Sequence, residues 1–455
     1  MWSRWRVARG GIVVVVAAGA AFATVMTVAP TAGRATTTGS APPDPMFASD
    51  AAAPPRRGET RPSWTPVVGS ARVCVHARDA VAATRAETTL VAAERALGLV
   101  AASGLPAPPP DAGRGGSYAL DLYLESGPRA EARAVLDPVA GVLSPFDRGP
   151  AFVRVALPWH APECAVSTTA TEAVVAATWI GLDAAPSPAT VRAHAGYVAQ
   201  AWAPCRPLLA AAVDAAQRRP ERALLSHEAP LLGWFIEDRF GVGPVGTVSS
   251  SLWAVGAQPS RPGSHHHDEP DLFDVLREVM PTRHKTLGEM LLDLAVARAF
   301  MGSRSDGQHL EDTRWLGDLG RIRFDWRLDY ASLPRRVAPP HPLAPTGASY
   351  VWIDLQDQVP AGHGLTLQAT WETSHVFEWA IVRLDAAGRS LGAHRAGGVF
   401  GAHEAFTTLE TLDGASYLLV VAVHVGNDDR QRPYDPDAGP PRVTSYELTL
   451  RPRAP

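Results

Sequence analysis

Apolar residues follow two different patterns along the chain. Before a Pro-rich stretch at residues 333–347 most apolar runs have helical spacing, and after it they alternate with polar residues at the two-residue period of strands. Two alternating runs at residues 118–124 and 153–157 predict a small sheet within the first part. The helical spacing predicts helices over residues 77–102, 166–180, 189–202, 230–240, 271–280 and 287–301.

The C-terminal part predicts an all-β sandwich. Its alternating runs are separated by turn glycines at a spacing typical of such folds. The best of them read "YVWIDLQ", "GLTLQATWE", "FEWAIVRLDAAG", "SYLLVVAVHVG" and "TSYELTL". The predicted fold class is therefore α+β: a mainly helical domain with a small sheet at residues 69–332, a Pro-rich linker at 333–347 and a β-sandwich at 348–453.

The N-terminal segment predicts export. In "MWSRWRVARGG" arginines precede an uncharged apolar run at residues 12–29. The run is at the lower length limit for a membrane span, so residues 1–29 are either a signal peptide or an N-terminal membrane anchor, and we favour the anchor. Residues 30–68, rich in Ala, Pro, Thr and Gly, predict a disordered linker. We expect a periplasmic, membrane-anchored or extracellular protein.

Charge and aromatic content narrow the expected partners. A net charge of −4 provides no basic excess, so nucleic acid is not expected, and the membrane contact that we expect is through the N-terminal segment. In the sandwich, Trp352, Trp371, Phe377 and Trp379 either fill the core, which is the commoner use, or form a surface that binds a peptide or polysaccharide.

The cysteine count allows at most one disulfide within the chain. The three cysteines are Cys74, Cys164 and Cys205. Cys164 and Cys205 bracket predicted helices, so we favour them as the pair and expect Cys74 to be buried or free. Spacing alone does not decide the pairing.

The stretch "STTATEAVVAATWIGLD", residues 167–183, predicts a helix with one acidic residue, Glu172, in its body. In zinc peptidases two histidines at i and i+4 bind the metal, and a glutamate at i+1 is the general base. Glu172 has the position of the base, whereas Thr171 and Val175 stand at the ligand positions. Glu172 is therefore the candidate catalytic residue, either as a relic or as a working base, or else a helix residue paired with an arginine.

The order of the predicted elements resembles exported bacterial metallopeptidase-like proteins of the gluzincin type. These have a helix, a short sheet, an active-site helix, a second helix with the third ligand, a bundle and a C-terminal sandwich. "SHEAPLLGWFIEDRFGVGPVGTVSSSLW" resembles the segment after their active site, and the C-terminal runs resemble pre-peptidase-type sandwiches. The resemblance implies a zincin-like fold and matches the third ligand to His194. From the helix alone we expect His194 to be half-exposed.

We expect a catalytically degenerate metallopeptidase-like protein, without a cofactor, that acts in binding or assembly at the cell envelope. One alternative is an active zinc hydrolase with Glu172 as base and ligands from His194, His227 and Glu228, although His227 and Glu228 also suit the start of the next helix. Another alternative is an envelope protein with an unrelated helical fold and a β-sandwich binding module. The tract "SHHHDEPD", residues 264–271, is expected to be a solvated loop that adsorbs metals weakly.

Overall fold

The structure is a computed structural model, and the residues that it describes are 61–111, 113–137, 148–184, 187–227, 229–257, 270–356, 359–397, 403–427 and 442–455. All of these residues belong to one unit, Asp44–Pro455, whereas the unit Met1–Pro43 lies outside them. The expected signal peptide or anchor therefore also lies outside the described residues. Among the described helices, none has both the length and the apolar character needed to cross a membrane.

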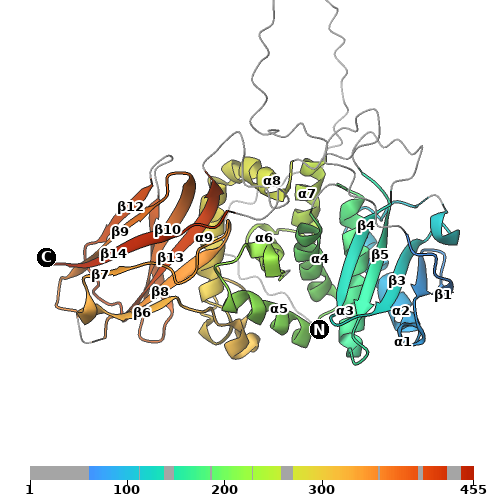
Figure 1. Ribbon diagram of the computed structural model, residues 1–455, viewed down its shortest axis with the longest axis horizontal. Coiled ribbons are helices and arrows are strands. Elements are labelled where there is room, and N and C mark those ends of the chain that lie inside the picture. The colour runs from blue at the N-terminus through green and yellow to red at the C-terminus, as the bar shows by residue number, and fades with distance from the viewer. Residues whose placement is uncertain are drawn as a thin grey trace, which may run out of the picture. The chain divides into compact units, whose positions relative to one another are not determined.

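A five-stranded sheet organises the first part of the chain (Figure 1). Its strands are β1 (Pro66–Gly69), β2 (Val73–Ala77), β3 (Leu120–Ser126), β4 (Glu131–Leu136) and β5 (Ala151–Leu157). The order is β1-β2-β3-β5-β4, in which β2, β3 and β5 are parallel and the edge strands β1 and β4 are antiparallel to their neighbours. The alternation of apolar and polar residues predicts β3 and β5 but not β2 or β4. β2 is buried on both faces, and the inward-facing residues of β4 include small alanines, so neither strand alternates clearly.

Helices cover one face of this sheet, and further helices form a bundle beside it. In chain order the helices are α1 (Ala80–Ala83), α2 (Ala86–Ala102), α3 (Glu163–Ile180), α4 (Pro188–Trp202), α5 (Arg206–Arg218), α6 (Leu231–Phe240), α7 (Thr247–Gly256), α8 (Leu272–Val279) and α9 (Leu287–Ala299). α2 and α3 pack against each other and against the sheet, where they share a core with Val75, Leu122 and Val153 (Figure 1). α5 and α7 are additional to the predicted helices, although the buried residues of both helices recur at helical spacing.

Two further sheets pack face to face in the C-terminal part, so the fold is α+β as the hydrophobic pattern predicts. Their strands are β6 (Trp326–Asp329), β7 (Arg335–Val337), β8 (Ala348–Asp354), β9 (Gly364–Trp371), β10 (His375–Leu384), β11 (Ser390–Gly397), β12 (Glu404–Leu409), β13 (Tyr417–Asn427) and β14 (Tyr446–Arg453). The sheet orders are β11-β10-β13-β8-β6 and β12-β9-β14-β7. Trp371, Phe377 and Trp379 are buried between the sheets, so they form core and not a docking surface.

The boundaries of the two predicted linkers are wrong in part. β6 precedes the expected linker at residues 333–347 yet belongs to the sheet of β8, β10, β11 and β13, and β7 lies inside that linker. The prolines there suit an edge strand and turns, which is why the composition resembles a linker. Residues 61–68, at the end of the expected linker at 30–68, also belong to the fold, because β1 begins at Pro66 and Arg61 bonds to Asp137.

α9 covers the outer face of the sheet that contains β10, β13 and β8. It packs on β10 and β13, and the Tyr350 hydroxyl on β8 donates a 2.9 Å hydrogen bond to the carbonyl of Ala295. Ala380 and Val382 on the outer face of β10 share a core with the helices, whereas Trp379 and its alternate neighbours face the second sheet. This sheet is therefore buried on both faces where α9 crosses it.

Candidate functional site

Glu172 lies in the middle of α3, a helix that is buried on nearly every side. The helix begins after Pro162, with Glu163 in the first turn where a carboxylate stabilises the positive end of the helix dipole. Thr171 and Val175, at the two ligand positions, are buried, and the Thr171 hydroxyl donates to a carbonyl one turn earlier. The side chain of Glu172 is 12% exposed, on a side of α3 that the neighbouring helices leave partly open.

Glu172 lines a groove of about 430 Å³ between α3, α4 and α5. The start of β4 contributes Glu131, and α4 contributes Arg192 and Gly196. α5 forms an apolar wall with Pro207, Leu208, Ala211, Ala212 and Ala215. The groove therefore has a charged side and an apolar side, and its volume falls in the range of sites that bind small ligands or peptide side chains.

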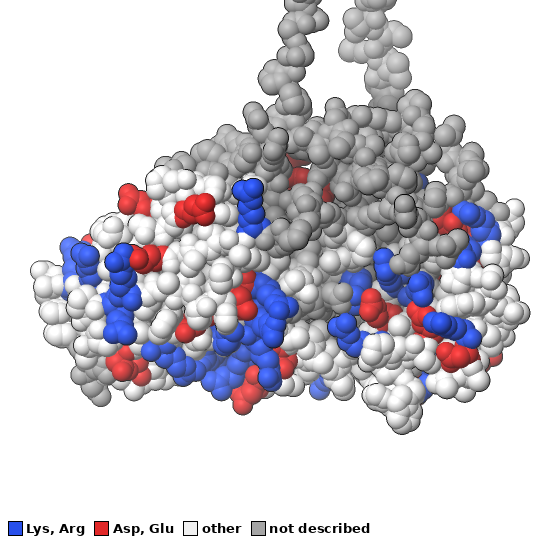
Figure 2. Space-filling model, in the orientation of Figure 1, with Lys and Arg blue, Asp and Glu red and all other residues white. Residues whose placement is uncertain are grey.

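Arg192 connects the acidic residues of the groove. Its Nη1 donates to Glu131 Oε1 at 3.1 Å, and its Nε lies 3.8 Å from Glu172 Oε1. The side chains of Arg192 and Glu172 are 13% and 12% exposed, so their attraction is less screened than that of a surface pair. Figure 2 shows acidic and basic residues next to one another on the face over α4 and β4. A guanidinium group thus faces the carboxylate that has the position of the base.

His194 does not lie in the groove, and the expectation that its ring is half-exposed is wrong. The residue is fully buried, with Nδ1 3.0 Å from Ser249 Oγ and its ring 5.0 Å from that of Trp253. Two positions after Arg192 on the same helix, it points away from the groove toward α7. Burial lowers the pKa of His194 to about 3, so the imidazole is neutral. The structure therefore does not bring His194 and Glu172 together.

The other residues of the alternative ligand set are outside the described part. His227 ends a short 3₁₀ turn, but its side chain, Glu228 and the histidines at 265–267 are not among the described residues. Of that set, only Glu172 and His194 have a described position.

Cys164 and Cys205 form a disulfide, which is the pairing that the sequence analysis favours. It ties the start of α3 to the start of α5, and Cys205 lines the groove. Cys74 is buried and is not part of a disulfide. The covalent link therefore supports the wall opposite Glu172.

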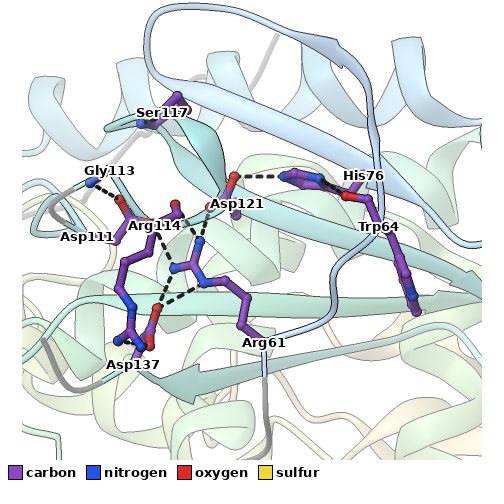
Figure 3. Close-up of polar contacts among 10 residues, drawn as sticks. Arg61, Trp64, His76, Asp111, Gly113, Arg114, Ser117, Asp121 and Asp137 are labelled. Atoms are coloured by element: carbon purple, nitrogen blue, oxygen red, sulfur yellow. Dashed lines mark hydrogen bonds and ion pairs between the residues drawn. The ribbon is translucent and has the colours of Figure 1, made fainter.

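A second polar group is buried on the face of the first sheet opposite α2 and α3 (Figure 3). Arg61 lies at its centre: Nε donates to Asp137 at 2.9 Å, Nη2 lies 2.7 Å from Asp111, and Nη1 contacts Asp121. Arg114 donates a further bond to Asp137. Burial acts to lower the pKa of Arg61, but the charges of Asp137 and Asp121 outweigh burial and raise the pKa above its ordinary value. We call these five residues the Arg61 cluster.

β2 and β3 bring Cys74, His76 and Asp121 together beside Arg61. Cys74 and His76 are two positions apart and share one face of β2, and Asp121 is the partner of Cys74 in the parallel pairing with β3. His76 Nε2 lies 2.8 Å from Asp121 Oδ1, and Nδ1 lies 2.8 Å from the carbonyl oxygen of Trp64 (Figure 3). One side-chain N, O or S atom from each of the three residues lies within 4.8 Å of the others, and all three are buried.

The sequence pattern did not reveal this group, because no strand is predicted at residues 73–77 and Cys74 is expected only to be buried or free. A signal was present in the alternation of "VCVHA" and "LDLYLE", which places Cys74 with His76 and Asp121 with Tyr123. The sequence does not reveal that the two strands are neighbours in this register.

Comparison with known proteins finds little similarity. No protein-family model matches the chain, and no curated protein matches it. Among solved structures, the chain is similar to the insecticidal delta-endotoxin Cry8Ea1 from Bacillus thuringiensis, with 14% identity and a TM-score of 0.17 over 30% of this chain. The matched part spans 26% of the toxin. A similarity this low bears neither on the fold nor on the function of the chain.

Proposed function

We propose that this protein is an exported cell-envelope protein whose first domain is a degenerate metallopeptidase-like module that binds peptide segments without hydrolysing them. Export rests on the charged and apolar pattern of residues 1–29. The observation that carries the proposal is the groove beside Glu172, in which Arg192 faces that carboxylate and neither ligand position has a histidine.

The arrangement of elements supports a metallopeptidase-like layout. A mixed sheet with an antiparallel edge strand, β4, lies against α3, and α4 follows as the second helix. Glu172 on α3 and Arg192 on α4 both face the same groove. These are the helices that carry the base and the third ligand in the proteins that the sequence resembles.

The chemistry of the groove supports binding over hydrolysis. Peptide hydrolysis by a zincin needs a metal-bound water next to the base, and the metal needs three protein ligands. Thr171 and Val175 cannot supply the helical pair, and His194 faces the opposite side of α4. The apolar wall of α5 instead suits a segment with apolar side chains, and the charged side, where Arg129 and Arg192 balance Glu131 and Glu172, can bind its polar groups.

We expect the groove variants E172A and A212W each to weaken peptide binding about tenfold, which is about 1.4 kcal/mol. Glu172 supplies a carboxylate to the groove, and a tryptophan side chain in place of the half-buried Ala212 would fill the groove along its apolar wall. The measurement is fluorescence anisotropy of the full chain with a labelled library of unstructured heptapeptides that combine apolar and charged residues.

The control is R218M, on the same helix as Ala212 but 71% exposed and outside the groove lining. It should bind the library like the unaltered chain, and equal loss in all three variants would contradict a site in the groove. Hydrolysis of quenched fluorescent casein is expected to be absent. Hydrolysis that both a chelator and E172Q abolish would support the active hydrolase instead.

A further inference from the structure

We infer that Cys74, His76 and Asp121 form a buried zinc-binding site on the first sheet, separate from the groove. The thiol, imidazole and carboxylate are the ligand types that zinc takes in proteins. They come from adjacent parallel strands, so the rigid ladder between β2 and β3 sets their spacing. The inference does not depend on the proposed peptide binding.

The hydrogen bonds of His76 carry the argument. Each ring nitrogen lies 2.8 Å from an oxygen that can only accept, the carbonyl of Trp64 and the carboxylate of Asp121. A neutral imidazole has one N–H and can donate to only one of them. If Nδ1–H donates to Trp64, the Nε2 lone pair faces a carboxylate oxygen, which requires a positive ion or a second proton between them. An N–H donated to a backbone carbonyl is also how metal-binding histidines are usually oriented.

The distances suit a zinc ion after small shifts. Ligands at zinc bond lengths of about 2.0–2.3 Å lie roughly 3.3–3.8 Å apart in a tetrahedral site, between the 2.8 Å from His76 to Asp121 and the 4.8 Å limit for the whole set. The second carboxylate oxygen of Asp121 contacts Arg61, which would hold the ligand in place from outside the metal shell (Figure 3). A fourth position would be left for water.

The charges around the site also favour a cation. In the Arg61 cluster, three carboxylates face two guanidinium groups, which leaves one negative charge in a largely buried region. Cysteine binds zinc as a thiolate, so a zinc ion would displace the thiol proton of Cys74. A thiolate and a divalent ion together would make the region formally neutral. Zinc binding should therefore release a proton and weaken in acid.

The test is zinc content by elemental mass spectrometry on the full chain, with His265, His266 and His267 replaced by alanine to remove weak adsorption. We expect one zinc per chain, reduced at least tenfold in C74S and in H76Q and unchanged in the control E172Q. The zinc-loaded chain should also unfold at a higher temperature than the chelated chain, and C74S should lose this difference. Cobalt substituted for zinc should show thiolate-to-metal charge-transfer absorption that C74S lacks.

Three outcomes would overturn the site. The first is that the chain with Cys74, His76 and Asp121 intact holds no zinc. The second is that folded C74S and H76Q keep their zinc, and the third is a cobalt spectrum without the thiolate band. The cobalt spectrum needs no variant, so it decides even if a substitution prevents folding. If zinc is lost in E172Q but retained in C74S, the metal binds at Glu172, and both this site and the proposed function are wrong. If zinc is lost in C74S but not in E172Q, the zinc site is supported, and peptide binding is decided by its own assay.

Discussion

Replacing Arg61 with alanine is expected to lower the free energy of unfolding by about 3–5 kcal/mol. The Arg61 side chain is 12% exposed and contacts three carboxylates, of which Asp121 is fully buried. Without the guanidinium, these carboxylates would face one another in a region of low dielectric constant, where each must stay ionised without its partner or take up a proton. Urea unfolding of the R61A and unaltered chains measures the loss.

The matched control for this prediction is R114A. Arg114 also bonds to Asp137, but its side chain is 46% exposed and Asp137 keeps its bonds to Arg61, so the expected loss is below about 1 kcal/mol. R61K should fall between the two, because an ammonium group keeps the charge but cannot contact several carboxylates as a planar fork does. An R61A variant that is as stable as R114A would show that the Arg61 cluster does not hold the 61–65 segment on the sheet.

Raising the pH from about 5 to 8 is expected to destabilise the unaltered chain by about 3 kcal/mol more than E378Q. Glu378 lies on the face of β10 that α9 covers and packs against Gly288 at the start of that helix. Burial and the charge of Glu289 raise the pKa of Glu378 to about 7, although Arg395 acts in the opposite direction. The carboxyl group is therefore protonated in the fold over a range where an exposed glutamate is charged.

The sign follows from comparing the folded and unfolded states. An unperturbed glutamate titrates near 4.5, and Glu378 in the fold near 7. Stability from the protonated group is complete below about 4.5 and is lost as the pH rises through about 7, because the unfolded state then loses its proton more easily. At 1.36 kcal/mol per pH unit, this interval corresponds to about 3 kcal/mol. Glutamine cannot ionise, so E378Q should lack the dependence.

Neighbouring charges supply the control for Glu378. Arg395 lies 3.5 Å from Glu289 and also contacts Asp293, which is paired with Lys285. E289Q keeps the capping box of α9, because glutamine can serve at that position, but it removes a negative charge near Glu378. The pH dependence should shrink in E289Q. Equal dependence on pH in E378Q and the unaltered chain, measured by urea unfolding at pH 5 and pH 8, would contradict the assignment.

The sequence by itself determined the class of the fold and the elements with long apolar runs. The apolar runs of α3, α4, α9, β10 and β13 depend only on residues close in the chain, so they are visible without a structure. The same local pattern singled out Glu172 as the one acidic residue in the body of its helix. It could not reveal Arg192, because the turn that sets α4 beside α3 is decided by packing.

Tertiary structure alone decided which side chains meet. Arg61 and Asp137 are 76 residues apart, and His76 and Asp121 are 45 apart, yet they bond in one buried region. His194 is a second example: the sequence predicts its helix, but its burial depends on contacts with α7, which follows about fifty residues later in the chain. Hydrophobic periodicity reports which face of an element is buried, whereas contacts between distant segments depend on strand order and helix packing, which no local pattern encodes.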